Sequence, residues 1–128
     1  SLHLPLTDDQ AEFDSQVLAL AIVLIDYMNE KEIAKQTHNL PDGAKGITKF
    51  ETFLNEHGFD NVDIVIPFLR RLWELRSTGA GHRKGENYRK AAAVFGVGQV
   101  GLRTVFSNIL RQAISTIDAL DAYFLDSR

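Results

Sequence analysis

The spacing of apolar residues along the chain predicts helices almost throughout. Between residues 8 and 36 apolar side chains recur at steps of three and four, which places them on one face of an α-helix. The sequence before it, Thr7-Asp8-Asp9-Gln10, has the form of a capping box. The middle of this helix, VLALAIVLI at 17–25, is apolar on every side, which predicts a central helix or one shared with a second subunit.

Glycine and proline divide the rest of the chain. Residues 38–46, HNLPDGAKG, are expected to form a loop because three breakers interrupt the pattern. Apolar spacing then predicts further helices at about 47–57, from Asp60 or Asn61 to Ser77, from Asn87 to Phe95, and at 99–126. No stretch shows the alternation of a strand, so the predicted fold class is all-α, a bundle of four to five helices.

The sequence predicts the structural role of several individual residues. Gly58 suits the left-handed residue after the second helix, and His57 is interpreted as a helix-end residue rather than a ligand. Pro67 either kinks the third helix or marks its true start. The large aromatic residues of that helix, Phe68 and Trp73, are expected in the core.

The composition is that of an ordinary globular protein. With 128 residues, 45% hydrophobic and 24% charged, we expect one domain over 1–128. The absence of cysteine excludes disulfides and thiolate chemistry and fits a reducing compartment. The longest apolar run has nine residues, against roughly 18 for a membrane span, so we expect a cytoplasmic protein without a membrane partner. The start SLHLPL lacks methionine, as in a processed product or the C-terminal part of a larger protein.

The charge is distributed unevenly. The net charge is −3, but residues 70–90 hold seven Lys and Arg against two Glu, a local balance of +5. A concentrated basic segment on an acidic body is typical of a phosphate-binding surface. A solvated, charged helix end is the alternative interpretation of the same residues.

A glycine pattern near the end of the chain resembles a nucleotide-binding motif but lacks its context. Gly96, Gly98 and Gly101 spell G-x-G-x-x-G. A dinucleotide site requires a strand before this motif, whereas the preceding YRKAAAVF has the pattern of a helix. We therefore interpret the glycines as a helix break in which Gly96 or Gly98 takes a positive φ.

The basic segment also contains a pair of residues suited to RNA cleavage. Arg76 and His82 enclose the five residues STGAG, whose glycines allow the histidine to fold back toward the arginine. Cleaving RNA without a metal requires a group that moves a proton, for which histidine is suited. It also requires a cation that offsets charge on the phosphate, for which the arginine fork is suited. On spacing alone, a helix-end arginine and an unrelated loop histidine remain the alternative.

The neighbouring residues extend this predicted site. Arg83, Lys84 and Arg89 are expected to hold flanking phosphates, as is Lys90. Asn87 and Tyr88 could add hydrogen bonds or a stacking surface for a base. No cofactor and no metal are expected.

The context of the pair resembles the HEPN superfamily. An all-α chain of this length with LRSTGAGHRKGENY between two helices is similar to the C-terminal HEPN domains of abortive-infection-type bacterial proteins. The family motif is R-x4-6-H, which Arg76 and His82 match. Members often place Asn, Asp or His after the arginine, where this chain has Ser77. The similarity covers about 8–126 in helix order, and its specific part is 75–88.

The resemblance implies a metal-independent endoribonuclease domain of a defence or toxin–antitoxin system. In it, His82 would act as general acid or base and Arg76 would stabilise the phosphate. It also implies RNA as substrate, a homodimer in which two motifs line one cleft, and a fused or antitoxin partner. Other members have lost catalysis. A non-catalytic helical module for RNA binding, protein interaction or dimerisation therefore remains the alternative.

Overall fold

The structure is a computed structural model that describes residues 2–36, 44–79 and 85–126. Within these ranges the chain is all-α, as the apolar spacing predicts, and forms no β-strand. None of the helices described there is long and apolar enough to cross a membrane. The five helices are α1 (Gln10–Gln36), α2 (Ala44–Glu56), α3 (Val62–Gly79), α4 (Glu86–Phe95) and α5 (Leu102–Asp126).

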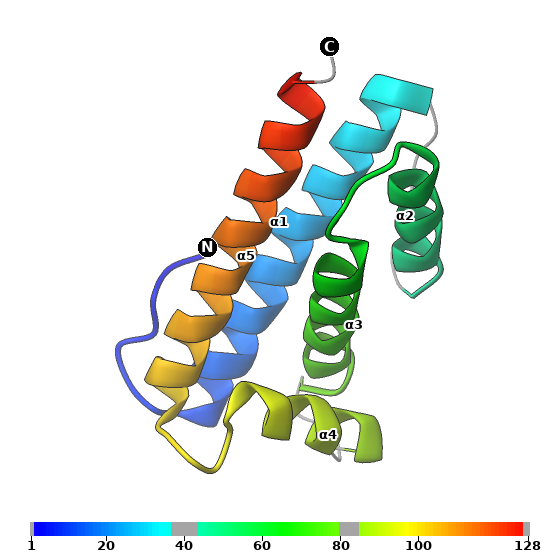
Figure 1. Cartoon of the computed structure of the whole chain (residues 1–128). Helices are drawn as coiled ribbons and strands as arrows, with labels where there is room; N and C mark the ends of the chain where they lie inside the picture. The colour runs from blue at the N-terminus through cyan, green and yellow to red at the C-terminus, as the bar shows by residue number, and fades with distance from the viewer. Residues whose placement is uncertain (1, 37–43, 80–84, 127–128) are drawn as a thin grey trace.

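The two longest helices lie side by side and run in the same direction (Figure 1). Ring contacts agree with this arrangement, because Phe13 near the start of α1 packs edge-on against Phe106 near the start of α5. α3 packs against α1 and also contacts α2 and α4. Figure 1 shows α2 beside the upper part of the bundle and α4 lying across its lower end. The C-terminal end of α3 and the whole of α4 therefore meet at one end of the molecule.

The core lies where the predicted apolar stripes face each other. α1 buries most of the apolar residues at these steps and leaves Ile25 half-buried; the buried ones are Phe13, Val17, Leu20, Ala21, Leu24 and Met28. α5 contributes Phe106, Ile109 and Leu120. Of the two aromatic residues expected in the core, Phe68 is buried, whereas Trp73 is only half-buried. The position of Trp73 was therefore predicted only in part.

The start of α1 differs from the prediction by two residues. The helix begins at Gln10, and Asp9 is its cap, because the Asp9 carboxylate accepts a hydrogen bond from the Glu12 backbone N–H at 3.3 Å. Glu12 in turn accepts hydrogen bonds from the backbone N–H and the hydroxyl of Thr7 at 2.8 and 3.0 Å. These bonds, chiefly the one from the Thr7 backbone, lower the pKa of Glu12. The capping residues are thus Asp9 and Glu12 rather than Thr7 and Gln10.

Other helix boundaries also shift. α2 begins at Ala44, so the predicted loop at 38–46 was wrong for its last three residues, and its first six lie outside the described residues. Gly46 lies inside this helix and is buried, although glycine costs about 1 kcal/mol in a helix interior. Pro67 lies inside α3, so it does not mark the start of that helix.

Three glycines that follow helix C-termini take a positive φ. Gly58, Gly96 and Gly98 have φ values of 73°, 91° and 92°. Gly96 ends α4 in the left-handed conformation, and the motif at 96–101 therefore follows a helix rather than a strand. The interpretation of these glycines as a helix break is confirmed. α5 accordingly begins at Leu102, three residues later than predicted.

The N-terminal segment passes beside the start of α5 (Figure 1). The Asp8 carboxylate accepts a hydrogen bond from the Arg103 backbone N–H at 2.9 Å and so caps α5 from another part of the chain. A Cβ at Gly101 would lie 2.9 Å from Asp8 Oδ1. A side chain at the third glycine of the motif would therefore displace the Asp8 carboxylate from this position.

Candidate functional site

Arg76 lies in the last turns of α3, as predicted, and is half-buried. Its guanidinium carbon lies 4.3 Å from the centre of the Trp73 ring, one helical turn earlier. This stacking is a cation–π contact that restricts where the guanidinium can point. The C-terminal end of a helix also favours a cation. His82, Arg83 and Lys84 lie outside the described residues, so the pairing of Arg76 with His82 remains a prediction.

The Arg76 side chain borders a pocket of about 270 Å³ between α1 and α3, which we call the Arg76 pocket. Its apolar wall comes from the side of α1 that faces α3, together with the Trp73 ring. Its polar groups come from both helices. α1 contributes the Asp26 carboxylate and the Asn29 amide, and α3 contributes the Arg76 guanidinium. The complete lining is Ala21, Ile22, Ile25, Asp26, Asn29, Trp73 and Arg76.

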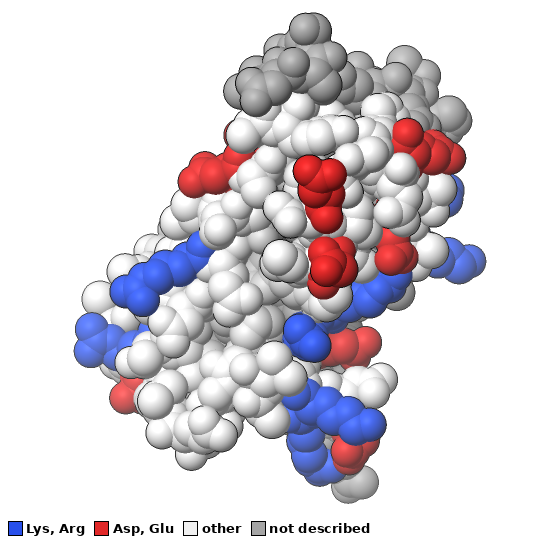
Figure 2. Space-filling model, viewed as in Figure 1, with Lys and Arg blue, Asp and Glu red and all other residues white. Residues whose placement is uncertain are grey.

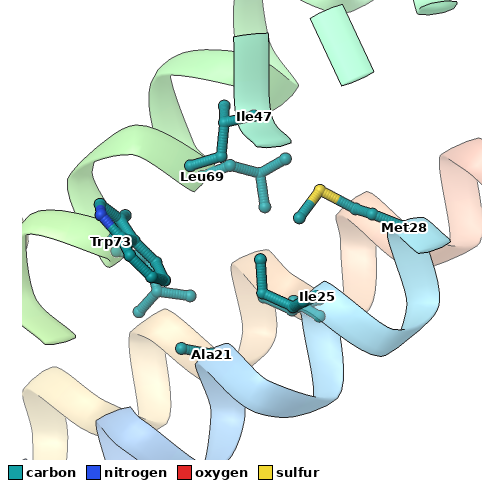
Figure 3. A pocket seen from close by; sticks show the side chains of 8 residues that line it. Ala21, Ile25, Met28, Ile47, Leu69 and Trp73 are labelled. Carbon is teal, nitrogen blue, oxygen red and sulfur yellow. The ribbon is translucent and has the colours of Figure 1, made fainter. Parts of the chain in front are cut away.

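The wall of the Arg76 pocket continues inward into the core. Figure 3 shows a small apolar gap where side chains of α1 and α3 point toward one another, with Ile47 of α2 at one side. The gap measures about 10 Å³, which is the space of roughly one water molecule. Trp73, Ala21 and Ile25 line both spaces. The inner gap is therefore a packing feature, whereas the outer pocket is open enough to contact a ligand.

A second hollow lies where α3 meets α4, and we call it the α3–α4 groove. It measures about 370 Å³. The α4 side of the groove is formed by four residues spaced three and four apart, which therefore share one face of that helix. The α3 side is formed by residues from one face of α3. Figure 2 shows Lys and Arg gathered over this lower end of the molecule. The lining residues are Arg70, Arg71, Glu74, Asn87, Lys90, Ala91 and Val94.

Tyr88 does not occupy the role predicted for it. Only 6% of its surface is exposed, and its hydroxyl is 3.2 Å from the Gln10 side-chain amide, which donates to it. Because Ala91, Ala92 and Phe95 follow it at steps of three and four, α4 turns Tyr88 into the core with them. The ring therefore presents no stacking surface for a base. The same spacing in the sequence was the signal that could have identified it as a core residue.

The other α4 residues predicted to bind RNA do not all lie in the same place. Asn87 lines the α3–α4 groove, whereas Arg89 is not among the residues that line it. The Arg89 guanidinium lies 3.8 Å from the Glu86 carboxylate, and both side chains are about two-thirds exposed. Such a surface pair contributes little to stability. Among the residues that accompany Asn87 in the groove are two basic side chains from different helices, Arg71 of α3 and Lys90 of α4.

Comparisons with known proteins add no assignment: no family model, curated protein or solved structure matches the chain. Within the described ranges, no three His, Asp or Glu side chains lie close enough together to hold a metal ion.

Proposed function

We propose that the chain is a HEPN-like domain that binds and cleaves RNA without a metal ion. The observation that supports this proposal is the setting of Arg76. Its guanidinium is stacked on Trp73 at 4.3 Å, and the side chain lines a pocket that also offers the Asp26 carboxylate and the Asn29 amide. A cation held in this way is suited to bind a phosphate group.

The proposed reaction uses the RNA's own hydroxyl as nucleophile. The 2′-oxygen forms a bond to phosphorus while the bond from phosphorus to the 5′-oxygen breaks. His82 would take the proton from the 2′-hydroxyl or supply one to the departing 5′-oxygen. Arg76 would bind the non-bridging oxygens, whose negative charge increases in the transition state. The products are a 2′,3′-cyclic phosphate and a free 5′-hydroxyl.

In this proposal the protein acts in the cytoplasm as the ribonuclease domain of a defence or toxin-type system. Its substrate is RNA, and its macromolecular partners are a second copy of the chain and a fused or antitoxin protein. The basic balance of +5 over residues 70–90 supports an RNA substrate, because phosphate contacts dominate the affinity of nucleic-acid binding.

The test is RNA cleavage in excess chelator, comparing wild type with Arg76→Ala, Arg76→Lys and His82→Ala. Arg76→Ala and His82→Ala should each lower kcat by roughly 100-fold or more. Arg76→Lys should recover only part of the loss, because lysine lacks the bidentate fork. Arg111→Ala removes the same charge from α5 and should behave as wild type. If wild type leaves RNA intact, or if the Arg76 and His82 variants cleave normally, the proposal is wrong.

A second candidate function is a non-catalytic dimerisation module. It is favoured by apolar side chains that α1 leaves exposed: Leu18 and Ile22 lie one turn apart and are 38% and 51% exposed. Ile22 also lines the Arg76 pocket. Self-association through this face would suit both candidates, because it would place the Arg76 of each subunit near the shared surface. Cleavage assays separate the two functions, since only the first predicts turnover.

A further inference from the structure

The α3–α4 groove places positive charge at a position that the Arg76–His82 motif does not include. Arg71 and Lys90 come from different helices and line the same hollow. Both residues are exposed, and neither forms a hydrogen bond or ion pair with another described residue. Two like charges that share a hollow repel each other, and a bound anion would relieve that repulsion.

The other polar residues that line the groove do not add to its positive charge. Arg70 is already engaged with α2, because its guanidinium lies 3.1 Å from the Glu51 carboxylate and 3.3 Å from the Thr48 hydroxyl. Glu74 supplies the groove with one carboxylate, and Asn87 supplies an amide that can both donate and accept. The groove therefore offers an anion two cations that pair with no described residue and one neutral polar group, opposed by the single negative charge of Glu74.

We propose that the α3–α4 groove binds the phosphate backbone of single-stranded RNA next to the phosphate held by Arg76. This inference rests on the proposed function in that RNA is the ligand, but it assigns a separate binding surface. Arg71 and Lys90 contact phosphate oxygens, and Asn87 hydrogen-bonds to the sugar or base. Ala91 and Val94 form the apolar side of the groove.

The position of the groove on α3 favours a single strand over a duplex. Arg71 and Arg76 are five residues apart, which is about 7.5 Å along the helix axis and roughly 140° around it. The groove and the Arg76 pocket thus lie on different sides of one helix. A strand that reaches both must bend around α3. A flexible single strand can do this, whereas a short duplex is stiff on this scale.

The experiment measures binding of a fluorescently labelled single-stranded RNA in the His82→Ala background, so that the RNA is not consumed. Arg71→Ala combined with Lys90→Ala should weaken binding by about 10-fold or more. It should also lower the slope of log K against log salt by roughly one to two between about 50 and 200 mM salt. Glu74→Gln should tighten binding, because it removes the negative charge from the groove.

The matched control is Arg103→Ala combined with Arg111→Ala, which removes two exposed positive charges from α5. It should change binding by less than about 2-fold, and circular dichroism should show all variants helical. Equal losses in the control and the groove variant would overturn the inference, because net charge alone would then explain binding. Groove-dependent binding of poly-glutamate without RNA binding would also overturn it, in favour of an acidic protein partner.

Cleavage kinetics keep this inference separate from the proposed function. In the wild-type background, the groove variant should raise KM and leave kcat unchanged, whereas Arg76→Ala should lower kcat. If the groove variant binds RNA normally while cleavage still depends on Arg76, the inference fails and the proposed function stands. If RNA binds through the groove but is never cleaved, the inference that the groove binds RNA is supported and the proposed cleavage is wrong. If wild type binds no RNA, both fail.

Discussion

At the scale of single residues, three side chains tie α1 to α5. The Tyr27 hydroxyl donates to Asp121 Oδ1 at 2.6 Å, and Lys31 Nζ lies 2.9 Å from the same oxygen. The hydrogen bonds from Lys31 and Tyr27 lower the pKa of the Asp121 carboxyl. Burial and the bond to Asp121 raise the pKa of Tyr27. At neutral pH Asp121 is therefore charged while Tyr27 keeps its proton, which is the state that both hydrogen bonds require.

This cluster predicts a pH-dependent contribution to stability. Asp121→Asn should lower the free energy of unfolding by about 0.5–1 kcal/mol near neutral pH, because the Asp121 side chain is 40% exposed and solvent weakens the pair. The pKa of Asp121 is lower in the folded state than in the unfolded state. Its contribution is thus complete above the unfolded value of about 3.9 and is lost as the pH falls through the folded value.

Urea unfolding of wild type and Asp121→Asn at a series of pH values checks this prediction. The difference between the two proteins should stay constant from about pH 7 to pH 5 and shrink below about pH 4. Asp118→Asn removes the same charge from an exposed position of α5 and should change stability little at any pH. A difference that grows on acidification would contradict the assignment.

The sequence identified some residues of the site and misplaced others. It placed Arg76 correctly at the end of a helix, because an apolar pattern stops there and a basic segment begins. It assigned Trp73 to the core, although part of the ring is exposed and stacks on Arg76. The grouping of Arg71 with Lys90 depends on how α3 packs against α4, and no spacing along the chain encodes that contact.

At the scale of elements, the apolar periodicity predicted every helix that the structure describes but missed ends that depend on distant residues. α5 is the clearest case. The residues just before it contain no side-chain cap, and Asp8 supplies one from the other end of the chain, through its hydrogen bond to the Arg103 N–H. A cap that is remote in sequence leaves no local signal, so the predicted start at 99 was three residues early.

This remote cap makes Gly101 sensitive to substitution. A Cβ there would lie 2.9 and 3.0 Å from the two Asp8 carboxylate oxygens, so Gly101→Ala must displace the carboxylate from the α5 terminus. We expect a loss of about 1–2 kcal/mol in the free energy of unfolding, comparable to the loss of a helix cap. The measurement is urea denaturation with a fixed m-value.

A double-mutant cycle provides the control. In the Asp8→Ala background the carboxylate is gone, so the added methyl of Gly101→Ala should cost less than about 0.5 kcal/mol. Gly85→Ala should be nearly neutral, because a Cβ at Gly85 meets nothing within 4 Å. Additive effects of Asp8→Ala and Gly101→Ala would show that the two residues do not interact.

At the scale of the whole molecule, α1 both fills the core and leaves large apolar side chains exposed. Its all-round apolar sequence predicted a central helix or one shared with a second subunit, and the structure shows how the residues divide. Leu20, Leu24 and Met28 are buried inside the bundle, whereas Leu18 and Ile22 remain exposed. Ile22 also lines the Arg76 pocket. Large apolar side chains clustered on a surface are typical of an interface.

We therefore expect the protein to dimerise through this face of α1. Wild type should sediment as a species of twice 14.3 kDa at high concentration, and Ile22→Glu should remain a 14.3 kDa monomer, because a dimer would bury the new charge. Ile64→Glu is the matched control. Ile64 is also largely exposed, but it lies 12 residues before Arg76 on α3, about 18 Å along the helix axis, and its variant should still dimerise.

The same variants decide whether dimerisation matters for cleavage. Because Ile22 also lines the Arg76 pocket, the cleavage test adds Leu18→Glu, which lies one turn away on the same face and outside that lining. If the active site needs two subunits, Leu18→Glu should lose cleavage in proportion to its loss of dimer, while Ile64→Glu cleaves normally. The Ile22→Glu monomer should still bind RNA through the α3–α4 groove, because Arg71 and Lys90 belong to one chain. Cleavage by a monomeric Ile22→Glu protein at the wild-type rate would show that one subunit is sufficient. A wild type that sediments at 14.3 kDa at every concentration would exclude this face as an interface between copies.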